Sequence, residues 1–160
     1  MKKQLSLFVI SLPFVFALTS CGCHFKVNKR TNYIEAGYYE SNAADDETTK
    51  GKLTITAIDK EEYEASNGVD TIKDLAKEGY YKLEFYISYN NQEFEHFTFK
   101  NLRDKYDGAK YRPISYIDDF GNIFTPMPFS WPRHCSVLTP DEFGGHVNIE
   151  MRLIEENNNV

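Results

Sequence analysis

Residues 80–100 read YYKLEFYISYNNQEFEHFTFK, and this stretch decides the fold. Apolar or aromatic side chains recur at every second position before Asn90-Asn91-Gln92 and again after it. A period of two is typical of half-buried β-strands, and a polar triplet rich in asparagine is typical of the turn between them. The stretch therefore predicts a β-hairpin.

The length of the turn sets which residues pair across this hairpin. A three-residue loop with an asparagine in the left-handed conformation pairs Leu83 with Phe99. The same register pairs Phe85 with Phe97. A two-residue loop would pair Phe85 with His96 instead. The three-residue loop is preferred because it gathers more apolar surface on one face.

The same alternation, followed outward from the hairpin, predicts the remaining strands. Their expected ranges are 33–38, 52–57, 112–118, 122–125 and 146–154. Two short helices are expected over 59–68 and 71–78, because Asp59 can cap the first and apolar residues fall on one side of the second. The expected surface loops are 41–51 and 126–145, the second with a helical turn at 139–142.

The number and spacing of these strands indicate the fold class. About seven strands with irregular spacing and no internal repeat favour an all-β fold, an immunoglobulin-like β-sandwich with one or two short helices. A small lipocalin-like barrel is the alternative. The strands lie within residues 33–156, a length typical of a single domain with its own core. The polar residues 157–160 are expected to form a disordered tail.

The N-terminus carries the pattern of an export signal. Lys2 and Lys3 precede an apolar run over 5–18 that is too short to span a bilayer, so residues 1–20 are expected to be a signal peptide. The run ends in Leu18-Thr19-Ser20-Cys21, which resembles the lipobox of bacterial lipoproteins. The resemblance implies cleavage after Ser20 and a diacylglyceryl thioether on Cys21, with acyl chains such as palmitate.

A lipid anchor of this kind implies a fixed location. At about 0.8 kcal/mol per buried methylene, two or three acyl chains hold a protein on a membrane far more firmly than one chain does. The expected location is the outer face of a bacterial membrane, either the cell membrane or an outer membrane. Residues 21–32 then form a polar tether between the lipid and the domain.

The charge of the chain argues against some classes of partner. The full sequence has 18 basic and 24 acidic residues and a net charge of −6. Removal of Lys2 and Lys3 with the signal peptide leaves 16 minus 24, or −8. Such a charge argues against nucleic acid and anionic lipid as the main ligand. No phosphate-binding glycine loop or dinucleotide fingerprint occurs in the sequence, so no cofactor is expected.

Aromatic residues supply the candidate binding site. Trp131 lies in a proline-rich segment that can hold its ring exposed for stacking on a sugar or a partner chain. The doublets Tyr38-Tyr39 and Tyr80-Tyr81 fall in or beside expected strands, where exposed tyrosine suits protein or glycan contacts. For Trp131 the preferred interpretation is structural, a tryptophan that plugs one end of the fold. In a strand one tyrosine of each doublet must face away from the other, and plain strand propensity is the alternative for both doublets.

Three soft or imidazole ligands are candidates for a metal site. The long loop could bring His134, Cys135 and His146 together with an acid such as Asp141 to bind zinc. No two of them have the spacing of a known metal motif, so satisfied surface histidines are the preferred interpretation and no metal is expected. Residues 118–122 hold oxygen ligands around a glycine, but a hairpin turn is expected there instead of a calcium loop.

The cysteines outside the lipobox leave two possibilities open. An exported protein can form a disulfide between Cys23 and Cys135. A buried or unpaired thiol at Cys135 is the preferred interpretation, because the tether position of Cys23 provides little fixed geometry for the bond. For catalysis Cys135 would need a nearby base, and no serine lies in a Gly-x-Ser-x-Gly elbow.

These observations lead to an expected function. The mature part carries no motif of a named family, and its outline resembles the small immunoglobulin-like lipoproteins of low-GC bacteria. We expect a non-catalytic, membrane-anchored module that binds an envelope protein or a surface polymer. A carrier of a small ligand is the alternative, and a metal-dependent hydrolase centred on His134, Cys135 and His146 is the third candidate. An exposed apolar patch, an internal cavity and converging polar side chains would distinguish them.

Overall fold

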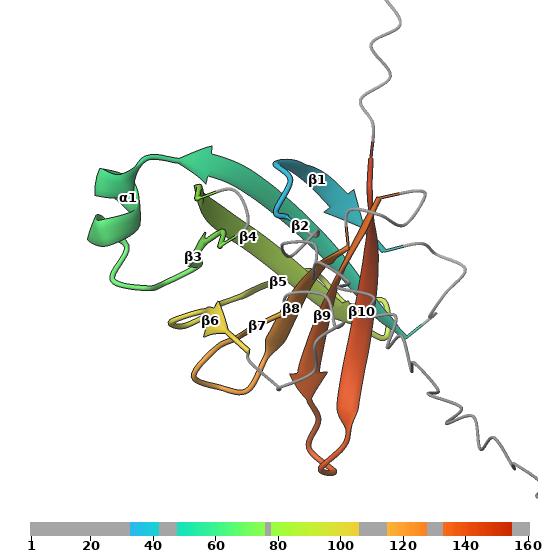
Figure 1. Ribbon diagram of the computed structural model, residues 1–160. Coiled ribbons are helices and arrows are strands. Elements are labelled where there is room, and N and C mark those ends of the chain that lie inside the picture. Colours follow the sequence, from blue (N-terminus) through green and yellow to red (C-terminus); the bar gives the residue numbers. More distant parts are fainter. Residues whose placement is uncertain (1–32, 42–47, 76–77, 106–114, 128–132, 155–160) are drawn as a thin grey trace, which may run out of the picture.

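The computed structural model describes residues 33–41, 48–75, 78–105, 115–127 and 133–154, and this part of the chain is mainly β (Figure 1). Its elements are β1 (Gly37–Glu40), β2 (Thr49–Ile58), α1 (Lys60–Ala65), β3 (Thr71–Lys73), β4 (Tyr80–Tyr89), β5 (Glu95–Phe97), β6 (Arg103–Asp104), β7 (Tyr116–Ile117), β8 (Ile123–Met127), β9 (His134–Pro140) and β10 (His146–Leu153). The signal peptide, tether, Cys21, Trp131 and C-terminal tail lie outside the described residues.

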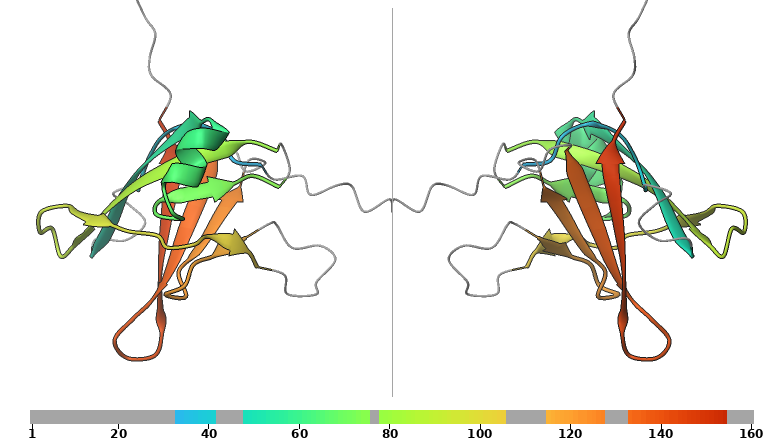
Figure 2. Two further views of the ribbon diagram at one scale, coloured as in Figure 1. Left: turned by 90° about the vertical axis from the view of Figure 1, so that its left-hand side faces the viewer. Right: turned by 90° about the vertical axis from the view of Figure 1, so that its right-hand side faces the viewer.

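The strands form one antiparallel sheet. Its order is β3-β4-β2-β1-β10-β9-β8-β7-β6, and β5 pairs with β4 on the edge that β3 also uses. The described residues thus hold ten strands where about seven were expected, and the additional ones are the short β3 and β6 and the seven-residue β9. Figures 1 and 2 show that β2 and β4 run obliquely to β9 and β10, so the sheet curls strongly.

The two ends of this strand order approach each other through the segment that follows β5. The Asp70 N–H, just before β3, donates to the Phe99 carbonyl at 3.0 Å. One residue later, the Lys100 carbonyl accepts the Asp119 N–H at 2.9 Å, in the turn after β7. Residues 99–100 therefore join the β3 end of the sheet to the β7 end, and the sheet is nearly closed.

The predicted hairpin and most of its register are confirmed. Phe85 pairs with Phe97, and Asn90 and Asn91 both have left-handed backbone angles. Leu83 and Phe99 are not paired directly, because Asp70 lies between them. The Asp70 carbonyl accepts the Leu83 N–H at 2.7 Å, and its carboxylate accepts the Phe99 N–H at 2.7 Å.

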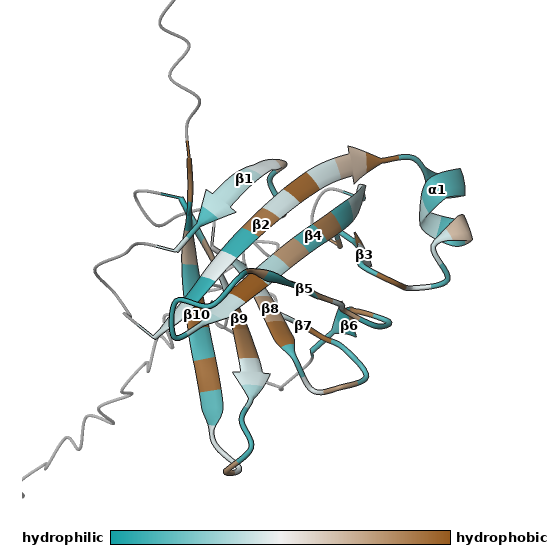
Figure 3. Ribbon diagram, turned by 180° about the vertical axis from the view of Figure 1, so that it is seen from behind, coloured by the Kyte–Doolittle hydropathy of each residue, from teal (hydrophilic) through white to brown (hydrophobic). Residues whose placement is uncertain are grey.

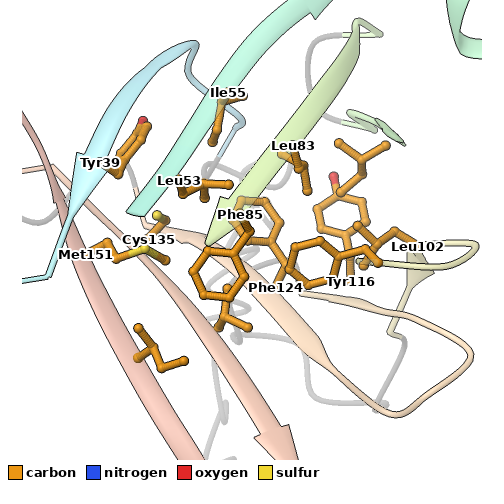
Figure 4. Close-up of a cluster of buried hydrophobic side chains, with 14 of the residues drawn as sticks. Tyr39, Leu53, Ile55, Leu83, Phe85, Leu102, Tyr116, Phe124, Cys135 and Met151 are labelled. Carbon is orange, nitrogen blue, oxygen red and sulfur yellow. The ribbon is translucent and has the colours of Figure 1, made fainter. Parts of the chain in front are cut away.

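The core lies inside the curled sheet, where inward side chains of opposite strands meet (Figure 4). Phe85 stacks on Phe99 with ring centroids 5.9 Å apart, and Phe97 meets both rings edge-on. Ile149 and Met151 of β10 are buried as predicted, and Val147 and Leu153 pack against the core. Figure 3 shows the matching alternation of hydrophobic and hydrophilic residues along β4 and β10.

Helix α1 confirms the first expected helix. The Asp59 carboxylate accepts the Glu62 N–H at 2.8 Å and so caps the first turn. The helix ends before Asn67 and Gly68, which both have positive φ angles. The sequence signals for this element are local, which explains why they were sufficient.

The second expected helix, over 71–78, is wrong. Thr71–Lys73 form β3 instead, paired with the start of β4, and Ile72 is fully buried there. Val69 and Leu75, which were expected on the same buried side, are both exposed. The free edge of β4 supplies backbone partners to this segment, and such tertiary pairing overrides a weak local helix signal.

The expected loop over 126–145 is also wrong, since it contains the whole of β9. Cys135, Val137 and Thr139 alternate inward along β9, which pairs with β8 and β10. Pro140 ends this strand, so the expected helical turn at 139–142 is replaced by a hairpin turn. In the same way β2 begins at Thr49, inside the expected loop over 41–51.

For the first expected strand, the predicted alternation of inward and outward side chains is wrong after Ile34. Ile34 and Tyr39 are both buried although they are five positions apart, and Tyr38, which was expected to share the face of Ile34, is exposed. Gly37 lies between them with a φ of 154°. Its unusual backbone angle shifts the alternation by one position, so β1 presents Tyr39 to the core.

Candidate functional site

The four predicted binding tyrosines have different environments. Tyr39 is in the core, with its hydroxyl donating to the Glu35 carbonyl at 2.9 Å, so it is the buried member of its doublet and does not form part of an exposed binding surface. Tyr80 is half-buried against the Tyr63 ring, with centroids 4.7 Å apart, and Tyr81 packs against the core. Tyr38 alone among the four is exposed.

The strand pairing places Tyr38 beside a row of side chains on the outer face of the sheet. Residues directly opposite one another in adjacent strands share a face of a sheet. From β5 to β9 this row consists of His96, Tyr86, Lys52, Glu40, Arg152 and His134. It crosses strands that are far apart in the sequence.

Side chains at the β5 end of this row contact one another. The rings of Tyr86 and His96 lie 5.4 Å apart, and the Lys52 ammonium lies 4.4 Å from the centre of the Phe94 ring. Lys52 also forms an ion pair with Glu40 at 4.0 Å. The Tyr38 hydroxyl donates to the Glu40 carboxylate. We call this set the outer ladder, which comprises Tyr38, Glu40, Lys52, Tyr86, Phe94 and His96.

Electrostatic interactions hold the ladder at both ends. Partial burial, followed by the hydrogen bond and charge of Glu40, raises the pKa of Tyr38 to about 12, so at neutral pH its hydroxyl is protonated. At the other end the His96 ring lies 3.3 Å from the Asp70 carboxylate. Burial raises the pKa of Asp70, and the hydrogen bond from the Phe99 N–H and the charge of His96 oppose this rise.

The composition of the outer ladder suits recognition of a surface. Tyr86, Phe94 and Tyr38 are 37–41% exposed, and charges of both signs lie between them. Exposed aromatic side chains with polar groups around them are typical of protein interfaces, and their flat faces also stack on sugars. The ladder can therefore bind by stacking and by charge-assisted hydrogen bonds.

The three candidate metal ligands do not come together. His134 begins β9 opposite Arg152, whereas His146 begins β10 opposite Pro140, at the other end of the hairpin. The seven residues of β9 place these ends about 20 Å apart. Within the described ranges, no group of three or more His, Cys, Asp or Glu side chains could hold a metal ion.

Cys135 is a free thiol in the core, which agrees with the preferred sequence interpretation. It is 1% exposed, and burial raises its pKa far above the usual range of a thiol. A nucleophilic cysteine needs its thiolate form. Cys23, the other half of the possible disulfide, lies outside the described residues.

The turn at 118–122 is a hairpin turn, as expected. The buried Asp118 carboxylate accepts the backbone N–H groups of Phe120 and Asn122, at 2.9 and 2.8 Å. The Asn122 side-chain amide donates to its second oxygen at 2.9 Å. Both carboxylate oxygens are thus occupied by protein donors, and the side chain stabilises the turn.

Sequence reasoning missed most of the outer ladder. Tyr86 and His96 have the opposite phase to Phe85 and Phe97, so the predicted hairpin already placed them on the outer face. That signal was available in residues 80–100. Lys52 and Glu40 could not be added to it, because their places depend on the pairing of β4 with β2 and of β2 with β1.

Comparisons with known proteins do not indicate a function for this site. None of the helices in the described ranges is both long enough and apolar enough to pass through a membrane. No protein-family model, curated protein or solved structure matches the chain.

Proposed function

We propose that this protein is a lipid-anchored interaction module of the bacterial envelope that binds an envelope protein or a surface polymer without turnover. The observation that carries the proposal is the outer ladder, which presents Tyr38, Tyr86 and Phe94 with Lys52 and Glu40 on one face. Rings held by neighbouring side chains lose little conformational entropy when they bind, which favours a preformed binding face.

A binding role is supported over catalysis by the places of the reactive groups. The Cys135 thiol is inaccessible, and His134 and His146 are at opposite ends of the β9–β10 hairpin. These were the candidates for a nucleophile and for metal ligands. The exposed polar and aromatic groups instead gather in the outer ladder, where they contact one another and shape a surface.

The lipobox supports the location. With Cys21 acylated and residues 21–32 as a tether, the domain would lie on the outer face of the cell membrane or an outer membrane. The tether would join the sheet close to Glu35, whose carboxylate pairs with the Arg133 guanidinium at 2.6 Å. The chain entry is thereby held against the start of β9.

For the finer class of the fold, we favour a small, partly closed barrel over an immunoglobulin-like sandwich. A single strand path that runs from β3 to β6 supports this class, because a sandwich has two separate sheets. The alternative function of a small-ligand carrier needs a cavity inside such a barrel. Phe85, Phe99 and Phe124 occupy its interior, which supports the outer surface as the binding site.

The experiment that tests the proposed function is a binding assay on the mature chain with Cys21→Ser. Bait carrying Y86S/F94S is compared with unchanged bait in capture from detergent-solubilised envelope and in sedimentation with purified cell-wall polymer. We expect a specific partner whose affinity falls at least tenfold in this variant, since two stacking rings are lost.

The matched control for this assay is L75S/Y89S, which removes two exposed hydrophobic side chains outside the outer ladder. Partners retained by both variants would contradict a role for the outer ladder.

A further inference from the structure

Two turns of this protein have nearly the same sequence. Residues 118–122 read DDFGN and residues 141–145 read DEFGG, so each has an aspartate, a second acid, a phenylalanine and a glycine in order. The first turn joins β7 to β8, and the second joins β9 to β10.

The two turns are also built by the same hydrogen bonds. In the second turn the Asp141 carboxylate accepts the N–H groups of Phe143 and Gly145, at 2.9 and 2.6 Å, as Asp118 does in the first. The Asp141 N–H donates to the Gly145 carbonyl at 3.0 Å, the same distance as from Asp118 to Asn122. The glycines, Gly121 and Gly144, have φ angles of 86° and 81°.

This shared construction holds each phenylalanine outward at one end of the sheet. Phe120 is 67% exposed and Phe143 is 95% exposed, more than any other large hydrophobic side chain in the described part of the chain. The start of β8 pairs with the end of β9, and a Cβ on Gly121 would lie 3.6 Å from Pro140 Cγ. The turns are therefore neighbours, and Figure 1 shows both at the same end of the sheet.

Acidic side chains lie beside both phenylalanines, and the basic side chains of Arg103 and Lys100 act on the acid beside Phe120. Each ring follows an exposed acid, Asp119 or Glu142. Asp119 is neutralised in part by the Arg103 guanidinium at 2.7 Å, whereas Glu142 is exposed at the tip of its turn. A ligand of this end of the sheet must accept two aromatic rings and tolerate or attract carboxylates.

We propose that Phe120 and Phe143 form a second docking site, for a protein partner that presents apolar pockets beside basic side chains. Two exposed apolar rings on turns held by hydrogen bonds, each next to an acid, match that chemistry. Anionic lipid is disfavoured by like charge. The start of the described chain lies away from the two turns, because Glu35 pairs with Arg133 just before β9 and the turns lie at the other end of that strand.

The site is separate from the outer ladder and does not depend on it. The Asp118 and Asp141 carboxylates are positioning groups, because they fix the backbone and leave the rings free to bind. Preorganisation of this kind raises affinity by lowering the entropy lost on binding. Loss of Asp141 should therefore weaken docking even though Phe143 remains.

The test uses a phage-displayed random peptide library as the probe, panned on the mature chain with Cys21→Ser. We expect enrichment of peptides that combine Arg or Lys with aromatic or aliphatic residues. Their affinity should fall at least tenfold with F120S/F143S, fall measurably with Asp141→Ala, and stay unchanged with the ladder variant Y86S/F94S. Thermal unfolding of F120S/F143S should match the parent protein, since both rings are exposed.

Several results would overturn the proposal. These are the absence of enriched peptides, enrichment of acidic peptides, or a set of enriched peptides in which none loses affinity with F120S/F143S. Phenylalanine-dependent sedimentation with phosphatidylcholine vesicles would replace the protein partner with a membrane. Phenylalanine-dependent dimerisation in analytical ultracentrifugation would replace it with a second copy of this chain.

Discussion

Gly51 is a residue of β2 that packs directly against side chains of β10. A Cβ at this position would lie 2.7 Å from Ile149 Cγ2, 2.9 Å from Phe85 Cε2 and 3.0 Å from Met151 Sδ. All three side chains belong to the buried core, so they have little room to move. The missing side chain of Gly51 is what lets the two halves of the curled sheet pack at this point.

We predict that Gly51→Ala lowers the free energy of unfolding by about 1–3 kcal/mol, because the added methyl group overpacks the core. Urea unfolding followed by circular dichroism measures the change. Thr56→Ala, at an exposed position of the same strand, is the control and should change stability by about 0.5 kcal/mol at most. Equal stability of the parent and Gly51→Ala would show that β2 and β10 are farther apart.

At the scale of elements, side chains that cross between segments fix the β7–β8 turn to its neighbours. Asp119 in the turn accepts hydrogen bonds from the Asn101 side chain at 2.6 Å and from Arg103 at 2.7 Å. These bonds, the one from Asn101 first, lower the pKa of Asp119. Asn101 itself has a positive φ angle, which asparagine tolerates better than most residues do.

We predict that NMR titration of the Asp119 carboxyl gives a pKa below its usual value of 3.8. Because the folded state prefers the ionised form, the contribution of Asp119 to stability is present above pH 3.8 and is lost as the pH falls through the lowered pKa. Arg103→Gln should raise this pKa back toward 3.8. Lys105→Gln, an exposed basic residue nearby, should leave it unchanged, and a shift of equal size in both variants would contradict the specific pairing.

At the scale of the whole molecule, closure of the sheet depends on Asp70. Its backbone bonds to Leu83 in β4 and to Phe99, and its carboxylate accepts the Phe99 N–H. The residue is buried and has a φ of 52°, a conformation that aspartate and asparagine adopt more readily than alanine. One residue thus joins three segments that are distant in the sequence.

We predict that Asp70→Ala destabilises the protein by about 2–4 kcal/mol, because it leaves a buried N–H group without a partner and strains the backbone. Asp70→Asn keeps an oxygen acceptor and the tolerated φ angle, so it should restore most of this loss. Chemical unfolding measures both variants, and hydrogen exchange at the Phe99 amide reports the local opening. Equal destabilisation by the two variants would show that the charge of Asp70, and not its oxygen, holds the closure.

The sequence by itself determined the parts of this protein whose signals are local. The alternation in residues 80–100 predicted the pairing of Phe85 with Phe97, and the spacing in β10 predicted its inward face. Asp59 marked the start of α1. In each case side-chain period or a cap within a few residues sets the structure, and these are properties that a sequence shows directly.

Only the tertiary structure decided the elements that depend on distant partners. Thr71–Lys73 form a strand because β4 offers a free edge, and β9 forms because β8 and β10 lie on either side of it. The outer ladder needs the register of successive strand pairs, and the closeness of the two turns that carry Phe120 and Phe143 needs the pairing of β8 with β9. Backbone hydrogen bonds between segments far apart in the chain supply this information, and no local pattern contains it.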